Sequence, residues 1–139
     1  MGDARPGFEI LEHTADVGIR SWGSSLEEAF EQAGLALAEI LDVRAEGSGE
    51  RREIRASGAD AGALLVDFLN QLVFLHETEE VGFARIRVTE ATETALTAQV
   101  DVVPVGGEPE GPPVKGATFH RLCVDQSPGR VEAQVYLDV

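Results

Sequence analysis

The sequence predicts an α+β fold in a single domain. Apolar and polar residues alternate with a period of two in several short stretches, and two longer stretches carry apolar residues at helical spacing. Their order along the chain is two strands, a helix, a strand, a helix and four strands. A chain of 139 residues can bury a core without disulfides or a structural metal. We therefore expect one compact domain over residues 1–139, with residues 1–6 disordered.

The first two predicted strands flank a polar corner. Residues 8–12 and 17–22 both alternate with a period of two, and His13, Thr14 and Asp16 lie between them. Two strands would hold these groups in place, which a functional site requires. An ordinary turn explains the same residues equally well, with Thr14 and Asp16 capping local amides and His13 satisfied at the corner. The spacing leaves both interpretations open.

A capping box marks the start of the first predicted helix. Ser25 is the expected N-cap and Glu28 follows three residues later, so each side chain is expected to satisfy the other's backbone donor. Gly34 weakens the helix, which we expect to end near Asp42. Its apolar stripe consists of Leu26, Ala29, Phe30, Ala33, Leu37, Ile40 and Leu41.

A charged edge strand and a buried helix come next. Residues 51–57 alternate around an apolar centre and carry many charges, which is typical of an edge strand. Asp60 is the expected N-cap of the second helix, whose wide apolar face over residues 64–75 predicts deep burial. Asp67 and Asn70 interrupt that face, and we expect both on the solvent side because polar helical residues are usually solvated.

The second half of the chain is predicted to contain four strands. Residues 83–89 and 96–103 form a hairpin joined by a short link, and a loop rich in glycine and proline follows over 104–113. The third strand, 114–124, is expected to alternate strictly between two faces, with Lys115 and Cys123 on one and His120 on the other. Cys123 is expected to be a buried, inert thiol.

A turn at 125–129 leads to the last strand, 130–139. Its residues Val131, Ala133, Val135 and Leu137 are expected to point inward. The strand places Asp138 next to the terminal carboxylate of Val139, so two anionic groups lie at its end.

The charge balance limits the classes of partner. Asp and Glu number 25 and Lys and Arg 11, which gives a formal charge of -14. Tight nucleic-acid binding depends on Lys and Arg, so direct binding of RNA or DNA is disfavoured. An acidic surface suits a basic protein or a hard cation, although solubility alone also explains it. A single cysteine and the lack of a signal or membrane-length apolar run predict a soluble cytoplasmic protein without membrane association.

Three separated groups are candidate metal ligands. Hard divalent cations prefer several oxygen donors, and Asp16, Asp138 and the Val139 carboxylate are of this kind. More than a hundred residues separate the first from the others, so spacing does not decide whether they meet. If they do, the site suits Ca, Mg or Mn and not zinc, with His13 as an outer group. The chain has no P-loop, dinucleotide fingerprint, nucleophile elbow or zinc motif.

Four stretches together resemble the archease family. They span nearly the whole chain in the family's order: residues 8–22 with the run His13-Thr14-Ala15-Asp16-Val17-Gly18, residues 64–75 with Asp67 and Asn70, residues 115–124 with Lys115 and His120, and the ending Asp138-Val139. The resemblance implies a compact fold with two main helices and a mostly antiparallel, barrel-like sheet.

The resemblance also implies a function. Archeases are accessory proteins of RtcB-type RNA ligases, which join RNA ends with GTP and a divalent metal, and they promote guanylylation and multiple turnover of the ligase in tRNA splicing or RNA repair. Carried over by position, the metal ligands fall on Asp16, Asp138 and Val139, where relatives commonly end in isoleucine. The functional lysine falls on Lys115, and His13 and His120 are further candidates to assist the partner's chemistry.

Two other functions compete with this one. The acidic surface also suits a general chaperone-like module, although a redox-switched version would need a zinc-binding cysteine set that this chain lacks. A metal-dependent hydrolase would use His13 as general base near Asp16. No nucleophile or substrate pocket is visible in the sequence, so we expect no independent catalysis.

Overall fold

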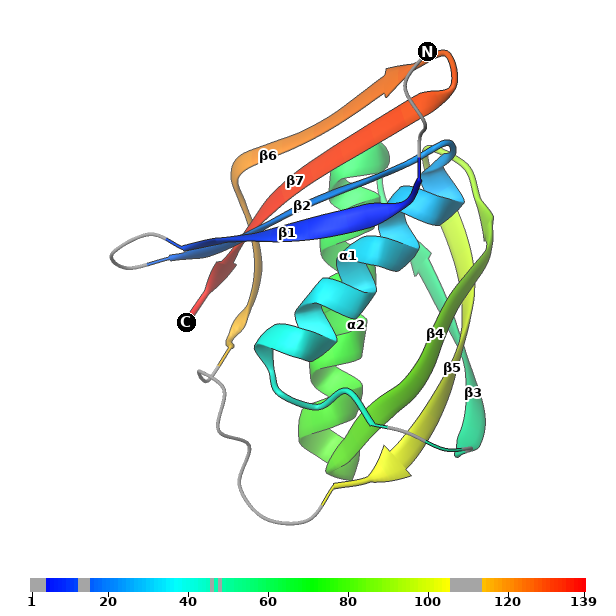
Figure 1. The fold of residues 1–139 in the computed structure, drawn as a ribbon, viewed down its shortest axis with the longest axis vertical. Coiled ribbons are helices and arrows are strands. Elements are labelled where there is room, and N and C mark those ends of the chain that lie inside the picture. The colour runs from blue at the N-terminus through cyan, green and yellow to red at the C-terminus, as the bar shows by residue number, and fades with distance from the viewer. Residues whose placement is uncertain (1–4, 13–15, 46, 48, 106–113) are drawn as a thin grey trace.

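The chain forms two helices and seven strands in the residues that the computed structural model describes, which are 5–12, 16–45, 47, 49–105 and 114–139 (Figure 1). The elements follow the predicted order. In chain order they are β1 (Gly7–Glu12), β2 (Val17–Gly23), α1 (Leu26–Ile40), β3 (Glu50–Ser57), α2 (Ala61–Glu79), β4 (Val81–Ala91), β5 (Ala95–Pro104), β6 (Gly116–Ser127) and β7 (Arg130–Asp138).

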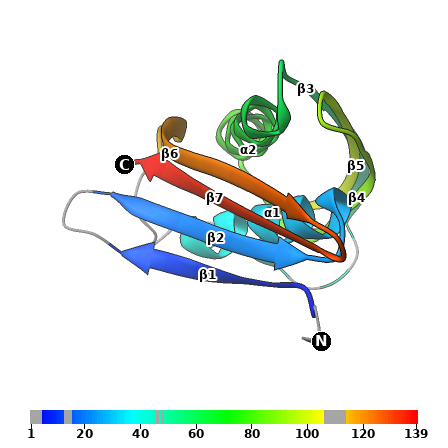
Figure 2. The ribbon, with the colours of Figure 1, turned by 90° about the horizontal axis from the view of Figure 1, so that it is seen from above.

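The strands form two antiparallel sheets with the helices between them. One sheet has the order β1-β2-β7-β6 and the other β3-β5-β4. Helix α1 packs on β2 and β4, and α2 packs on β6 and β3, so both helices lie between the sheets in Figures 1 and 2. The α+β class is confirmed, although the sheets stay open and do not close into a barrel. Neither helix of the described chain has the length and apolar content needed to cross a membrane.

The N-terminus of α1 shows half of the expected capping box. The Ser25 hydroxyl accepts a hydrogen bond from the Glu28 amide at 3.2 Å. The Glu28 carboxylate does not return to Ser25, because it accepts from the amide and the hydroxyl of Ser24, each at 2.8 Å. These hydrogen bonds from Ser24 lower the pKa of the Glu28 carboxyl. The hydrogen bonds of Glu28 therefore reach Ser24, which is one residue before the partner that the capping-box motif predicts.

Helix α2 has a deeply buried apolar face, as predicted. Asp60 caps it by accepting from the Ala63 amide at 2.8 Å, and its apolar face is fully buried. The prediction that Asp67 and Asn70 face solvent is wrong, since both are half-buried. Each accepts a hydrogen bond from the backbone of a neighbouring strand. The residues of the buried face are Leu64, Leu65, Phe68, Leu69 and Leu72.

These two polar side chains attach α2 to a different strand each. Asp67 accepts from the Ser57 amide at 2.9 Å, and Asn70 accepts from the Ala117 amide at 2.7 Å. An amide that points out from the edge of a sheet toward a helix has no neighbouring strand to bond to. A side-chain oxygen on that helix then supplies the missing acceptor. The polar positions are therefore structural links.

Strand β6 contains a bulge that the sequence does not predict. Thr118 pairs with Tyr136, but the next pair is Cys123 with Gln134, so four residues of β6 stand opposite one of β7. Arg121 in this bulge has a positive φ of 54°. Ala117 before the bulge and Val124 after it both pack on the core, although strict alternation would place them on opposite faces.

The bulge also changes the position of the only cysteine. Cys123 is exposed, so the prediction of a buried thiol is wrong. Partial desolvation and the nearby Asp125 carboxylate raise the pKa of the Cys123 thiol, which disfavours the reactive thiolate. Strand β6 runs on to Ser127, beyond the predicted start of the turn, whereas the inward-facing apolar residues of β7 are buried as predicted.

Candidate functional site

The start of β2 and the end of β7 lie side by side. Val17 pairs with Leu137 in antiparallel register, the last pair of the two strands, so Asp16 and Asp138 are the residues that directly adjoin this pair. Residues directly opposite in such a pair have Cα atoms about 5 Å apart and project from the same face. Figures 1 and 2 both show the C-terminus beside the start of β2. The candidate ligands that the sequence separates by more than a hundred residues therefore share one end of the sheet.

The start of β6 joins them from the other side of β7. The Lys115 amide donates a hydrogen bond to the Asp138 carbonyl at 2.8 Å, and Gly116 pairs with Asp138 in the sheet. Lys115 and Asp138 line an open groove of about 490 Å³ between α2 and β6. The lysine and the aspartate are exposed, so both can meet a ligand or a partner.

Asn70 positions this end of β6. Its side-chain oxygen accepts from the Ala117 amide, and a Cβ added to Gly116 would lie 2.8 Å from that oxygen. Only glycine allows this approach without displacing the asparagine. Sequence reasoning missed the role of Asn70, although a polar residue on an otherwise apolar helix face was the available signal.

The two candidate histidines differ in what the structure shows. His13 lies outside the described residues. His120 is exposed on the bulge of β6, and its ring meets the ring of Tyr136 edge to face, with centroids 6.3 Å apart. It is not among the described residues that line the groove with Lys115. The structure therefore does not bring His120 to the groove.

Gly18 makes room for the tyrosine ring beside this histidine. Gly18 and Tyr136 are cross-strand partners, and a Cβ on Gly18 would lie 2.8 Å from the ring. The ring thus lies over the glycine, two residues along the chain from Asp16. This aromatic contact is part of the framework that supports the paired strand ends.

The strand-end carboxylates differ from Glu132, which forms ion pairs within the same sheet. Glu132 pairs with Arg20 at 2.6 Å, and the hydrogen bond from Arg20 lowers the pKa of the Glu132 carboxyl. Among the ion pairs found within the described residues, none involves Asp16 or Asp138. Carboxylates that no arginine neutralises are suited to an external cation.

The described acidic side chains at this sheet end do not by themselves complete a metal site. The described residues contain no group of three or more His, Cys, Asp or Glu side chains close enough to hold a metal ion. Asp16 and Asp138 offer two carboxylates, and carboxylate oxygens suit a hard cation such as Ca, Mg or Mn.

The arrangement defines a class of small α+β domain with two sheets, two central helices and an acidic strand end. A protein of Methanobacterium thermoautotrophicum, solved in solution, shares this fold with a TM-score of 0.76 and 32% identity over 96% of this chain and 99% of that one. The crystal structure of an archease from Thermotoga maritima, described as a possible chaperone, has a TM-score of 0.64 and 24% identity over 93% and 94%. At that identity it shows the fold alone.

Sequence comparison identifies the family. The model of the Archease protein family (MTH1598/TM1083) matches residues 8–139. The Protein archease of Methanosarcina mazei is 34% identical over 95% of both chains, and that of Thermococcus gammatolerans is 37% identical over 95% of this chain and 98% of its own. The chain belongs to the Archease protein family, which confirms the resemblance found in its motifs.

Proposed function

We propose that this protein is a cytoplasmic accessory protein that activates an RtcB-type, GTP-dependent RNA ligase in tRNA splicing or RNA repair. It promotes guanylylation and multiple turnover of the ligase and has no turnover of its own. Membership of the Archease family supports an accessory role. The observation that supports the proposal is the Val17–Leu137 pair of β2 and β7, because Asp16 and Asp138 adjoin this pair at one sheet end.

Asp16, Asp138 and the carboxylate of Val139 would hold a divalent cation, Ca, Mg or Mn. When bound, the ion supplies a compact positive charge that attracts phosphate oxygens. Lys115 would add an ammonium to the same groove, because it lines that groove together with Asp138. The ammonium can contact a nucleotide phosphate or the partner's active site. His13 and His120 are secondary candidates.

A guanylylation time course tests the proposal. The ligase is mixed with GTP and metal, with and without this protein, and the covalent ligase-nucleotide adduct is measured. Wild type should accelerate adduct formation, whereas Asp16→Ala and Lys115→Ala should lose most of the stimulation. Glu39→Gln removes an exposed carboxylate from α1 and serves as the matched control. Unchanged guanylylation with wild type, or full stimulation by Asp16→Ala, would contradict the proposal.

A chaperone-like binding module is the second candidate. It is favoured by two exposed aromatic side chains, Phe74 and Phe119, which a general holdase could offer to unfolded clients. A holdase should suppress aggregation of unrelated denatured proteins at stoichiometric amounts. Specific activation of the ligase without such suppression would reject this alternative.

A further inference from the structure

Phe74 is an exposed aromatic residue beside the buried face of α2. Its exposure is 56%, whereas its neighbours Leu72 and Val73 are buried in the core. Single exposed apolar side chains are common on protein surfaces, but aromatic residues are enriched in the centres of protein interfaces. The ring is therefore a candidate contact for a protein partner.

The ring separates two hollows of the surface. On one side is the groove of about 490 Å³ that contains Lys115 and Asp138, and on the other is a hollow of about 280 Å³ between α2 and β3. Phe74 and Thr78 line both of them. A protein partner that fills the groove with Lys115 and Asp138 therefore also contacts Phe74, which lines the same groove.

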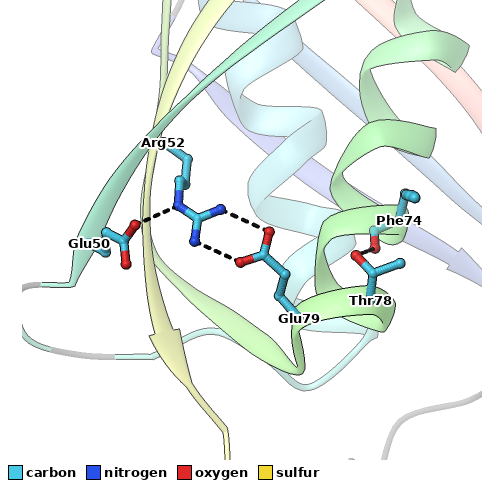
Figure 3. Close-up of polar contacts among 5 residues, drawn as sticks. All are labelled: Glu50, Arg52, Phe74, Thr78 and Glu79. Atoms are coloured by element: carbon cyan, nitrogen blue, oxygen red, sulfur yellow. Dashed lines mark hydrogen bonds and ion pairs between the residues drawn. The ribbon is translucent and has the colours of Figure 1, made fainter.

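The helix end that carries this ring is held rigidly. Figure 3 shows Arg52 on β3 reaching across to Glu79 on the last turn of α2, with the two guanidinium hydrogen bonds at 2.8 and 2.7 Å. Glu50 holds the same guanidinium at 2.9 Å, and the Thr78 hydroxyl donates to the Phe74 carbonyl at 2.7 Å. The backbone that carries the ring is thus tied to β3 before binding, which reduces the entropy that docking costs.

The charges around the ring indicate the chemistry of the partner. Glu77 and Glu80 are exposed at the C-terminal end of α2, where the helix dipole is negative and acidic residues are unfavourable. Arg52 compensates Glu79, but no ion pair within the described residues compensates Glu77 or Glu80. Asp138 adds a further negative charge across the groove. The surface is complementary to a partner with lysines and arginines around an apolar pocket.

We propose that Phe74 anchors a basic protein partner, whose apolar pocket receives the ring while its basic rim pairs with Glu77 and Glu80. The partner is the RNA ligase, and to that extent the inference rests on the proposed function. The ring sets affinity and orientation, and the neighbouring groove presents Lys115 and Asp138 to the ligase. Phe74 is thus a positioning residue and not a catalytic one.

Calorimetry of an RtcB-type ligase with wild type, Phe74→Ala and Phe119→Ala tests the inference. Phe119 is a matched control, because it is 66% exposed and lines neither hollow. Phe74→Ala should raise the Kd at least about tenfold, as expected for an interface anchor. Phe119→Ala should change the Kd less than about twofold. Glu77→Lys should slow association and reduce its salt dependence.

Guanylylation separates docking from chemistry. Excess Phe74→Ala protein should restore full stimulation, whereas excess Asp16→Ala should not, because only the first defect is one of affinity. An unchanged Kd for Phe74→Ala, an equal loss with Phe119→Ala, or a self-association that Phe74→Ala abolishes would overturn the inference and leave the proposed function standing. A wild-type protein that neither binds nor stimulates the ligase would overturn both.

Discussion

The amide of Lys115 donates a hydrogen bond to the carbonyl of Asp138 at 2.8 Å. This bond fastens the segment entering β6 to the end of β7, where Asp16 and the same aspartate adjoin the last pair of β2 and β7. A cation and an ammonium group can therefore act at one place although three distant parts of the chain supply them. Four measurements follow from this arrangement and from the packing that supports it.

If Asp16 belongs to the proposed cation site, Asp16→Asn should weaken the binding of a divalent cation by at least about tenfold, because it removes one carboxylate donor. Titration of the purified protein with Ca²⁺ or Mn²⁺ measures the affinity. Glu39→Gln, on the exposed side of α1, should bind like wild type. Equal affinities for Asp16→Asn and wild type would remove Asp16 from the site.

Asn70→Ala should lower the free energy of unfolding by about 1–3 kcal/mol, since the Ala117 amide would lose its acceptor at a half-buried position. Urea unfolding measures the change. Asn70→Asp keeps an acceptor oxygen and should retain most of the stability. If Asn70→Ala were as stable as wild type, the hydrogen bond would not hold β6 to α2.

Gly18→Ala should destabilise the protein by about 1–3 kcal/mol, because the new methyl group would lie 2.8 Å from the ring of Tyr136. The ring must move, and its edge contact with His120 changes with it. Thermal unfolding checks the stability, and the near-ultraviolet circular dichroism of the single tyrosine checks its environment. Unaltered spectra would show that the ring has room to spare.

Glu132→Gln should remove a pH-dependent part of the stability. Arg20 lowers the pKa of Glu132 in the folded state, so the stabilisation is fully present above the unfolded pKa of about 4.3 and is lost as pH falls through the lower folded pKa. The side chains of Arg20 and Glu132 are 43% and 30% exposed, so solvent screening limits the effect to about 0.5 kcal/mol.

Urea unfolding of wild type and Glu132→Gln between about pH 3 and 7 tests this sign, since the range brackets the usual glutamate pKa. The difference in free energy of unfolding should be constant at neutral pH and shrink below about pH 4. A difference that grew on acidification would mean that Arg20 does not stabilise the ionised carboxylate.

Much of the fold could be predicted from local patterns. Ser25 and Asp60 cap the two helices as their motifs indicate, and the β4–β5 hairpin has the predicted short link. The candidate site was harder to predict from the sequence than the fold. Asp67 and Asn70 were assigned to solvent, because their hydrogen-bond partners, Ser57 and Ala117, belong to other elements that no local pattern connects to α2.

The sequence by itself determined the type of each element and, except in β6, the inward face of the strands, because helix caps and apolar periodicity depend on residues within a few positions of one another. Only the tertiary structure decided that the start of β2 lies beside the end of β7 and that β6 bulges, shifting Cys123 to the surface. Pairing between distant strands depends on how the whole core packs, and one shift in register reverses every face that follows.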